Sequence, residues 1–134
     1  MTIEFDHYAY GGTGADGIAL VLSDAAVTPV PGSYGGSLGY AQRTNVSPSQ
    51  SGFSGGWLGI GFDEYGSFSQ ATEGRVGGTT ARPQAIGVRA ASSTNYGWLG
   101  GTTTLSPILS STGSTLAPVS YTHLRAHETK AHLV

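Results

Sequence analysis

The stretch WLGIGFDEY (residues 57–65) alternates in a way that decides the fold class. Leu58, Ile60 and Phe62 occupy every second position, and successive side chains of a β-strand point to opposite faces. The three apolar side chains therefore share one face of a predicted strand. Two glycines and an aspartate alternate with them on the other face, so this stretch predicts a half-buried strand in a sheet.

Further strands are predicted wherever a short apolar run lies between segments rich in glycine, proline or serine. These runs cover residues 3–10, 18–22, 38–41, 85–90 and 96–99, and the second of them is apolar enough to be buried on both faces. The chain has 22 glycines and only 10% charged residues, which is typical of a strand-and-turn protein. We therefore expect an all-β fold, a β-sandwich or jelly roll.

Charge and composition exclude several classes of partner. The formal net charge is −2, so we expect no basic surface for nucleic acid. The chain has no run of about 18 apolar residues, so we expect no insertion into a membrane. The chain has no cysteine and therefore no disulfide framework, and its first residues do not form a signal peptide. If the parent protein is exported, we expect its signal to lie upstream.

The segment GTGADG (residues 12–17) matches the glycine pattern of a dinucleotide-binding loop. That pattern has meaning only when a helix follows it and an acidic residue comes about 20 positions later. The apolar run after it has five residues, and no Asp or Glu lies between Ala25 and Phe62. A nucleotide site is therefore not expected, and Asp16 needs another explanation.

The last sixteen residues, VSYTHLRAHETKAHLV (119–134), differ from the rest of the chain. They contain its only lysine, three of its four histidines and none of its glycines. They resemble a peptide that ends unrelated metagenomic reading frames in which sequencing-adapter DNA has been translated. We therefore expect an artefactual tail that packs on nothing, after a partial β-sandwich region (1–102) and a Ser/Thr/Pro-rich loop or linker (103–118).

Catalysis is not predicted. Asp63 and Glu64 are adjacent in a strand, so they point to opposite faces and do not flank one glycosidic bond. A lone His7 is more often structural than a general base. Oxygen donors that suit calcium do occur in and beside loops, although Asp16 and Asp63 also fit the plainer roles of an Asx-type turn and a strand terminus.

Six segments in order resemble the bacterial branch of the L-type (legume-like) lectin domains. They are YGGTGADGIALVLSD (10–24), GGSLGY (35–40), GGWLGIGFDEYGSFS (55–69), EGR (73–75), RPQAIGVRA (82–90) and YGWLGGT (96–102). The resemblance implies a concanavalin A-like β-sandwich, here incomplete because family domains are about twice as long. It also implies calcium-dependent binding of glycans by an extracellular or cell-surface bacterial protein, an adhesin for example, with neighbouring domains in a larger parent.

The resemblance also implies roles for single residues. Asp16, preceded by a cis peptide bond, would accept hydrogen bonds from two sugar hydroxyls, and Gly36 would offer its backbone N–H. Asp63 would bind calcium through its carboxylate and Tyr65 through its carbonyl. The implied carbohydrate-binding residues are Asp16, Gly36, Tyr65 and Ser67, and the implied calcium ligands are Asp63, Tyr65, Ser67 and Glu73.

Three positions depart from the family pattern. Gly61 replaces a common glutamate, so no transition-metal site is expected. Ser67 replaces an asparagine whose amide touches both calcium and sugar, and a hydroxyl does not supply both contacts. Glu73 would have to serve as the second calcium carboxylate. These departures leave open an alternative function, a structural or adhesion spacer with a degenerate sugar site, and a related glycosidase is a third and weaker possibility.

Overall fold

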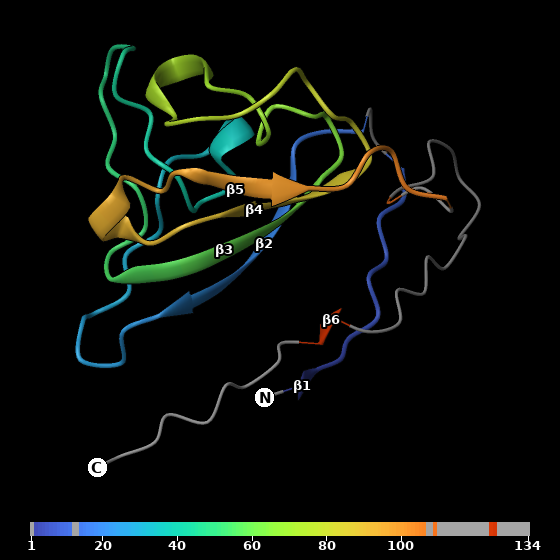
Figure 1. The fold of residues 1–134 in the computed structure, drawn as a ribbon, viewed down its shortest axis with the longest axis horizontal. Helices are drawn as coiled ribbons and strands as arrows, with labels where there is room; N and C mark the ends of the chain where they lie inside the picture. Colours follow the sequence, from blue (N-terminus) through green and yellow to red (C-terminus); the bar gives the residue numbers. More distant parts are fainter. Residues whose placement is uncertain (1, 12–13, 107–108, 110–123, 126–134) are drawn as a thin grey trace.

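The computed structural model describes residues 2–11, 14–106, 109 and 124–125 (Figure 1). The chain is mostly β, and its main element is a four-stranded antiparallel sheet in the order β2-β3-β4-β5. The strands are β2 (Gly17–Ser23), β3 (Gly56–Asp63), β4 (Ala85–Arg89) and β5 (Trp98–Gly101). Three short 3₁₀ helices lie in the connections: η1 (Gly35–Ser37), η2 (Thr72–Gly74) and η3 (Ser92–Thr94).

Glycines on one face of the sheet allow aromatic residues from the loops to pack directly against its backbone. We refer to this as the inner face. A Cβ atom at Gly59 would collide with the ring of Tyr40, and one at Gly87 would lie 2.8 Å from the indole of Trp98. Tyr40 and Phe68 are fully buried there. The alternation of glycine with larger residues in β3 and β4 therefore makes room for a layer of loops on one side of the sheet (Figure 1).

Two tyrosines fix the centre of this core. The rings of Tyr40 and Tyr96 meet edge to face, with centroids 5.3 Å apart. The Tyr40 hydroxyl donates to the Ala90 carbonyl at 2.8 Å, and the Tyr96 hydroxyl donates to the Phe53 carbonyl at 2.8 Å. Burial raises the pKa of Tyr40, with a further contribution from Tyr96. Both phenols therefore satisfy their polar group while filling the core.

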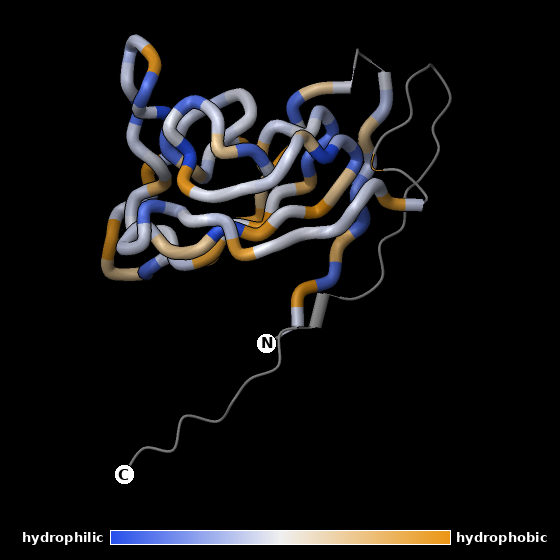
Figure 2. The backbone as a smooth tube through the Cα atoms, turned by 45° about the horizontal axis from the view of Figure 1, so that its top comes forward, coloured by the Kyte–Doolittle hydropathy of each residue, from blue (hydrophilic) through white to orange (hydrophobic). Residues whose placement is uncertain are grey.

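The opposite face of the sheet, which we call the outer face, is apolar across all four strands. Figure 2 shows apolar stretches running along the strands. The register places Ile18, Phe62 and Ile86 in one row, and Leu20, Ile60 and Val88 in the next. Phe62 is buried, at 2% exposure. The other large side chains of this face are only partly buried or exposed: Ile18, Leu20, Leu22, Leu58, Ile60, Ile86, Val88 and Leu99. At one end of this face, the rings of Phe5 and His7 pack on the ring of Phe62. Their centroids lie 5.4 Å and 5.9 Å, respectively, from the centroid of the Phe62 ring.

The strand predictions are confirmed at the centre of the sheet and wrong at three places. The run 18–22 forms β2, but it is not buried on both faces, because Ile18 remains 48% exposed. Of the run 3–10, only Ile3 lies in a strand, β1 (Thr2–Ile3). Residues 38–41 form a turn, because Leu38 and Gly39 have φ values of 52° and 72°, which no strand accommodates.

The expectation that residues 119–134 contact nothing is wrong at one point. Leu124–Arg125 (β6) pairs antiparallel with β1, with Thr2 opposite Arg125. An isolated extended segment has unpaired N–H and C=O groups that any second extended segment satisfies, whatever its origin. The rest of that segment lies outside the described residues. Among those that the structure does describe, no helix is long and apolar enough to cross a bilayer.

Candidate functional site

The GTGADG segment leads into a strand and not into a helix. Gly17 starts β2 and lies opposite Asp63 at the end of β3. The Asp16 carbonyl accepts hydrogen bonds from the N–H groups of Glu64 at 3.1 Å and Tyr65 at 3.4 Å. The Ala15–Asp16 peptide bond is cis. Asp16 is thus an exposed residue fixed beside the loop that follows β3.

The side chain of Asp63 holds the loop that follows β3. Its side chain is buried, and its Oδ1 and Oδ2 accept hydrogen bonds from the N–H groups of Gly66 and Phe68, both at 2.7 Å. Burial raises the pKa of Asp63 even though these two N–H groups lower it. The charges of Arg75 and Asp16 also act on this carboxyl, the first lowering its pKa and the second raising it. Asp63 therefore ends β3, as the plainer interpretation of the sequence predicted, and its carboxylate also holds the loop that follows.

Gly36 and Ser67 are brought into contact across two loops. A Cβ atom at Gly36 would overlap the Cβ of Ser67 and lie 3.4 Å from a guanidinium nitrogen of Arg75. Ser67 is half-buried, whereas the Tyr65 side chain is 62% exposed. The structure therefore places Asp16 beside Tyr65, and Gly36 beside Ser67, on loops that Asp63 and Arg75 support.

Glu73 is paired with two arginines. Its Oε1 accepts from Nε of Arg43 at 3.1 Å, and its Oε2 accepts from Nη1 of Arg75 at 2.9 Å. Burial opposes the ionisation of Glu73, but the hydrogen bonds from Arg75 and Arg43 outweigh it and lower its pKa. Both carboxylate oxygens of Glu73 are therefore engaged by cations of the chain itself.

The buried arginines are the functional residues that sequence reasoning missed. Arg89 is completely buried, and its five hydrogen bonds run to backbone carbonyls of Phe68, Gln70, Val76, Gly77 and Tyr96, at 2.9 to 3.3 Å. Its guanidinium also lies 5.4 Å from the ring centroid of Phe68 and 5.6 Å from that of Trp98. Burial, with the charge of Arg75, lowers the pKa of Arg89 to about 10. The alternation of side chains along the predicted strand 85–90 could have indicated this burial, because it puts Arg89 on the same face as Ala85 and Gly87.

This set of donors does not fit the calcium ion that the family resemblance implies. Calcium binds six to eight oxygens and favours free carboxylates. Asp63 is engaged by backbone N–H groups, Glu73 by two arginines, and the guanidinium of Arg75 already brings positive charge among them. Within the described part of the chain, no three side chains of the metal-ligating types gather at one point. As they are arranged here, these side chains therefore do not fit a calcium ion.

Gly61, where the family has a glutamate, is filled by neighbouring side chains. A Cβ atom there would lie 2.5 Å from Cδ1 of Phe68 and 3.0 Å from Cδ1 of Leu38. The space for a metal-binding side chain is thus occupied by the aromatic core.

We expect Gly61→Ala to lower the free energy of unfolding by about 2 kcal/mol, because the added methyl group overpacks this contact. Urea unfolding measures the change, and Gly97→Ala is the matched control, since a Cβ there meets only the Thr94 carbonyl at 3.4 Å. Equal effects of the two substitutions would show that Phe68 does not pack on β3 in this way.

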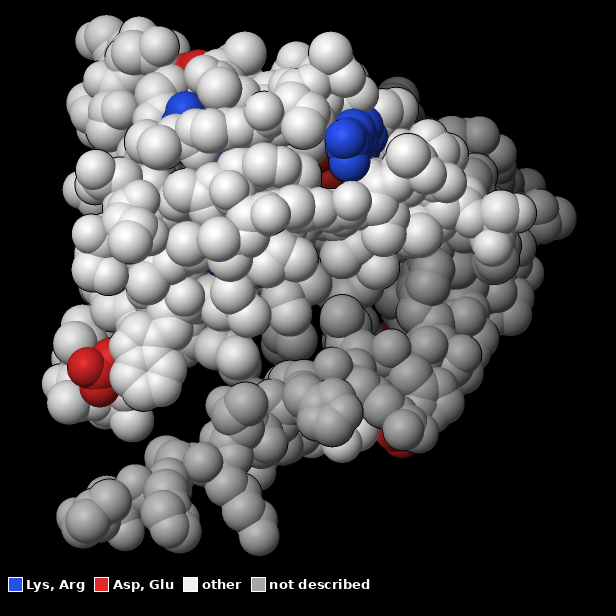
Figure 3. Space-filling view, viewed as in Figure 1, with Lys and Arg blue, Asp and Glu red and all other residues white. Residues whose placement is uncertain are grey.

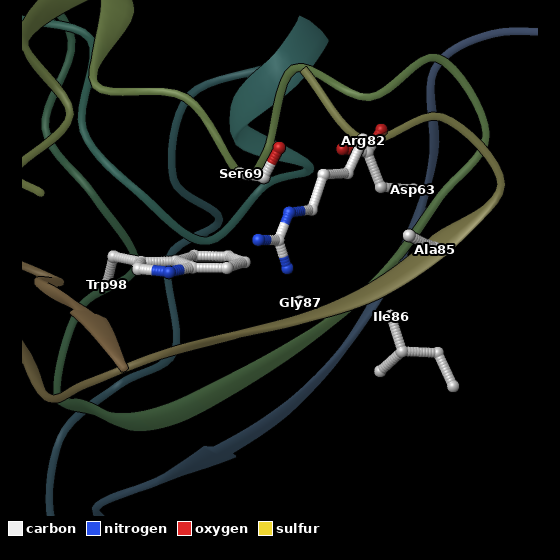
Figure 4. Close-up of a pocket in the computed structure, with 7 residues that line it drawn as sticks. All are labelled: Asp63, Ser69, Arg82, Ala85, Ile86, Gly87 and Trp98. Atoms are coloured by element: carbon white, nitrogen blue, oxygen red, sulfur yellow. The ribbon is translucent and has the colours of Figure 1, made fainter. Parts of the chain in front are cut away.

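A crevice between the inner face and the loops is too narrow for a sugar ring (Figure 4). Its lining includes Asp63, Ser69, Arg82 and Trp98, and the space between them has no room for a water molecule. The Arg82 side chain extends over it toward Trp98 in the figure. This crevice therefore offers no space for a sugar ring.

No family model, curated protein or solved structure matches this chain. Its function therefore has to be inferred from the loop contacts and the sheet register.

Proposed function

We propose that this protein is a carbohydrate-binding, lectin-like module and not an enzyme. One observation carries the proposal: the exposed Asp16 lies next to the exposed Tyr65, because its carbonyl accepts hydrogen bonds from the N–H groups of Glu64 and Tyr65. An ionised carboxylate accepts charge-assisted hydrogen bonds from neighbouring sugar hydroxyls. An exposed aromatic ring offers an apolar surface to the C–H face of a sugar. Gly36 and Ser67, on adjoining loops, complete the proposed site.

The arrangement of the acids supports binding over glycoside hydrolysis. Hydrolysis requires two carboxyl groups that flank a bond and are free to act as acid and base. Asp63 is buried with both oxygens occupied, and Glu73 is held by Arg43 and Arg75. Only Asp16 of these three is open to a ligand. The face of the molecule shown in Figure 3 carries few charged groups, of both signs, among mostly uncharged residues.

The alternative function, a structural spacer, is supported by the same observation that Asp63 and Glu73 are engaged by other groups of the chain. If the loops serve only to stabilise the sheet, Asp16 has no ligand to bind. The two functions make opposite predictions for this residue.

We expect Asp16→Asn to weaken glycan binding by about 2 kcal/mol, which corresponds to about 30-fold, because the amide loses the charge and turns one acceptor into a donor. A glycan array followed by titration of the best ligand measures the loss. Asp24→Asn is the control, since Asp24 makes a similar exposed turn, with Oδ1 accepting from Ala26 N–H at 2.8 Å, at the other end of β2.

If the Asp16 and Asp24 variants bind glycan equally well, Asp16 is not part of the site. Absence of binding by the unmodified protein to every glycan would favour the spacer function.

We also propose that the four-stranded sheet is one half of a concanavalin A-like β-sandwich. An antiparallel sheet with one face in water normally carries polar residues on that face, whereas the outer face here is aliphatic. The outer face of partly covered aliphatic side chains therefore supports a second layer. We propose that further strands of a larger parent protein supply it, and that this parent acts outside the cell or on its surface, where glycans are presented.

A further inference from the structure

A buried guanidinium lies next to Gly36 of the proposed site. The side chain of Arg75 is 1% exposed. It donates from Nη1 to the Ser37 hydroxyl at 3.1 Å and to Glu73 Oε2 at 2.9 Å. Nη2 donates to the Thr72 hydroxyl at 2.6 Å, and Nε donates to the Gln70 carbonyl at 3.2 Å. One side chain therefore joins η1 to the loop that contains η2.

Through these contacts Arg75 supports both the segment that carries Gly36 and the loop that carries Ser67. Ser37 is the residue after Gly36, and the Gly36 backbone itself lies close to Nη1. Ser67 packs against Gly36 from the other loop. The charge of Arg75 also acts on Asp63, which closes the loop that carries Tyr65. Removing Arg75 therefore loosens the positions of Gly36 and Ser67 together.

These contacts are the ones that a bound cation makes at a cluster of loops. A cation draws oxygen atoms from several segments together and offsets the charge of buried carboxylates. Arg75 contacts oxygens of Ser37, Gln70, Thr72 and Glu73 and lies near a second carboxylate. A divalent ion placed beside it would meet a like charge in a poorly solvated space.

We propose that Arg75 is the positioning residue of the sugar site and takes the organising role of a metal ion, so that the loops are ordered and glycan is bound without calcium. This inference rests on the proposed sugar-binding function.

Wild-type protein gives the first test. We expect the amide NMR signals of Gly36, Ser37 and Ser67 to be the same in chelator and in millimolar calcium, and the affinity for the best array glycan to be the same in both. Saturable calcium-dependent shifts of these three signals, or loss of glycan binding in chelator, would overturn the inference.

Substitution of Arg75 gives the second test. Arg75→Gln is expected to weaken glycan binding about tenfold or more, because the Ser37 contact is lost within a buried cluster. Arg75→Lys keeps the charge and is expected to restore part of the affinity. Arg43→Gln is the matched control, since Arg43 also binds Glu73, but its other side-chain hydrogen bond runs to the Tyr34 hydroxyl and not to Ser37 or Gly36.

A folded Arg75→Gln protein that binds glycan as well as Arg43→Gln overturns the positioning role. If Arg75→Gln does not fold, the comparison of wild type in chelator and calcium decides. If wild type binds no glycan in either buffer, the sugar-binding function fails, and the amide signals alone then decide whether the loops are ordered without calcium.

Discussion

Replacing Arg89 with methionine is expected to lower the free energy of unfolding by about 4 kcal/mol, the largest loss that we expect from any single substitution named for this protein. Methionine fills most of the volume but donates no hydrogen bond. Five backbone carbonyls would lose a donor. Those of Gln70 and Val76 keep a second one, from Arg75 Nε and Trp98 N–H. A buried carbonyl left without a partner costs about 1–3 kcal/mol, part of which water entering the site would offset.

Two further variants separate the hydrogen bonds of Arg89 from its charge. Arg89→Lys keeps the charge but has three donors, so we expect a loss of about 2 kcal/mol. Arg82→Met is the control, because Arg82 donates to the carbonyls of Gly101 and Thr102 from a more exposed position, and we expect less than about 1 kcal/mol. Urea unfolding in which Arg89→Met and Arg82→Met behave alike would show that Arg89 does not hold the loops to the sheet.

Introducing a charge on the outer face is expected to have the second largest effect. Ile60 lies in the middle of that face, between Leu20 of β2 and Val88 of β4. If a second β-layer covers it, Ile60→Lys buries an ammonium group without a partner and lowers the free energy of unfolding by about 3 kcal/mol. Thermal and urea unfolding of the larger parent protein, which supplies the second layer, measure this loss.

Val30→Lys is the matched control for this substitution. Val30 is 54% exposed in a loop, so a lysine there keeps its charge in water, and we expect a change within about 0.5 kcal/mol. If Ile60→Lys is tolerated as well as Val30→Lys, the outer face is open to water and the sandwich proposal is wrong.

The sheet was predictable because its strands follow local patterns. The alternation in 57–65 placed Leu58, Ile60 and Phe62 on one face, and β3 confirms it. The run 85–90 likewise forms β4. The apolar run of β2 was assigned correctly as a strand, but burial of both its faces depends on what packs against the sheet, which no local pattern specifies.

The loops were not predictable in the same way, because long-range contacts determine them. The turn at Leu38 places Tyr40 against Gly59, and neither position signals the other in the sequence. Asp63 and Glu73 were chosen as calcium ligands for their chemistry. Their partners, two backbone N–H groups and two arginines, come from elsewhere in the folded chain. Asp16 and Tyr65, whose proximity follows from strand pairing, remain the candidates for sugar binding.

The most direct test of sugar binding is an amide NMR titration of the protein with the best glycan from an array, in chelator. The proposed site predicts saturable shifts centred on Asp16, Gly36, Tyr65 and Ser67, with the signals of the outer face unchanged. Shifts confined to the outer face around Ile60 and Val88, or no shift with any glycan, would contradict it.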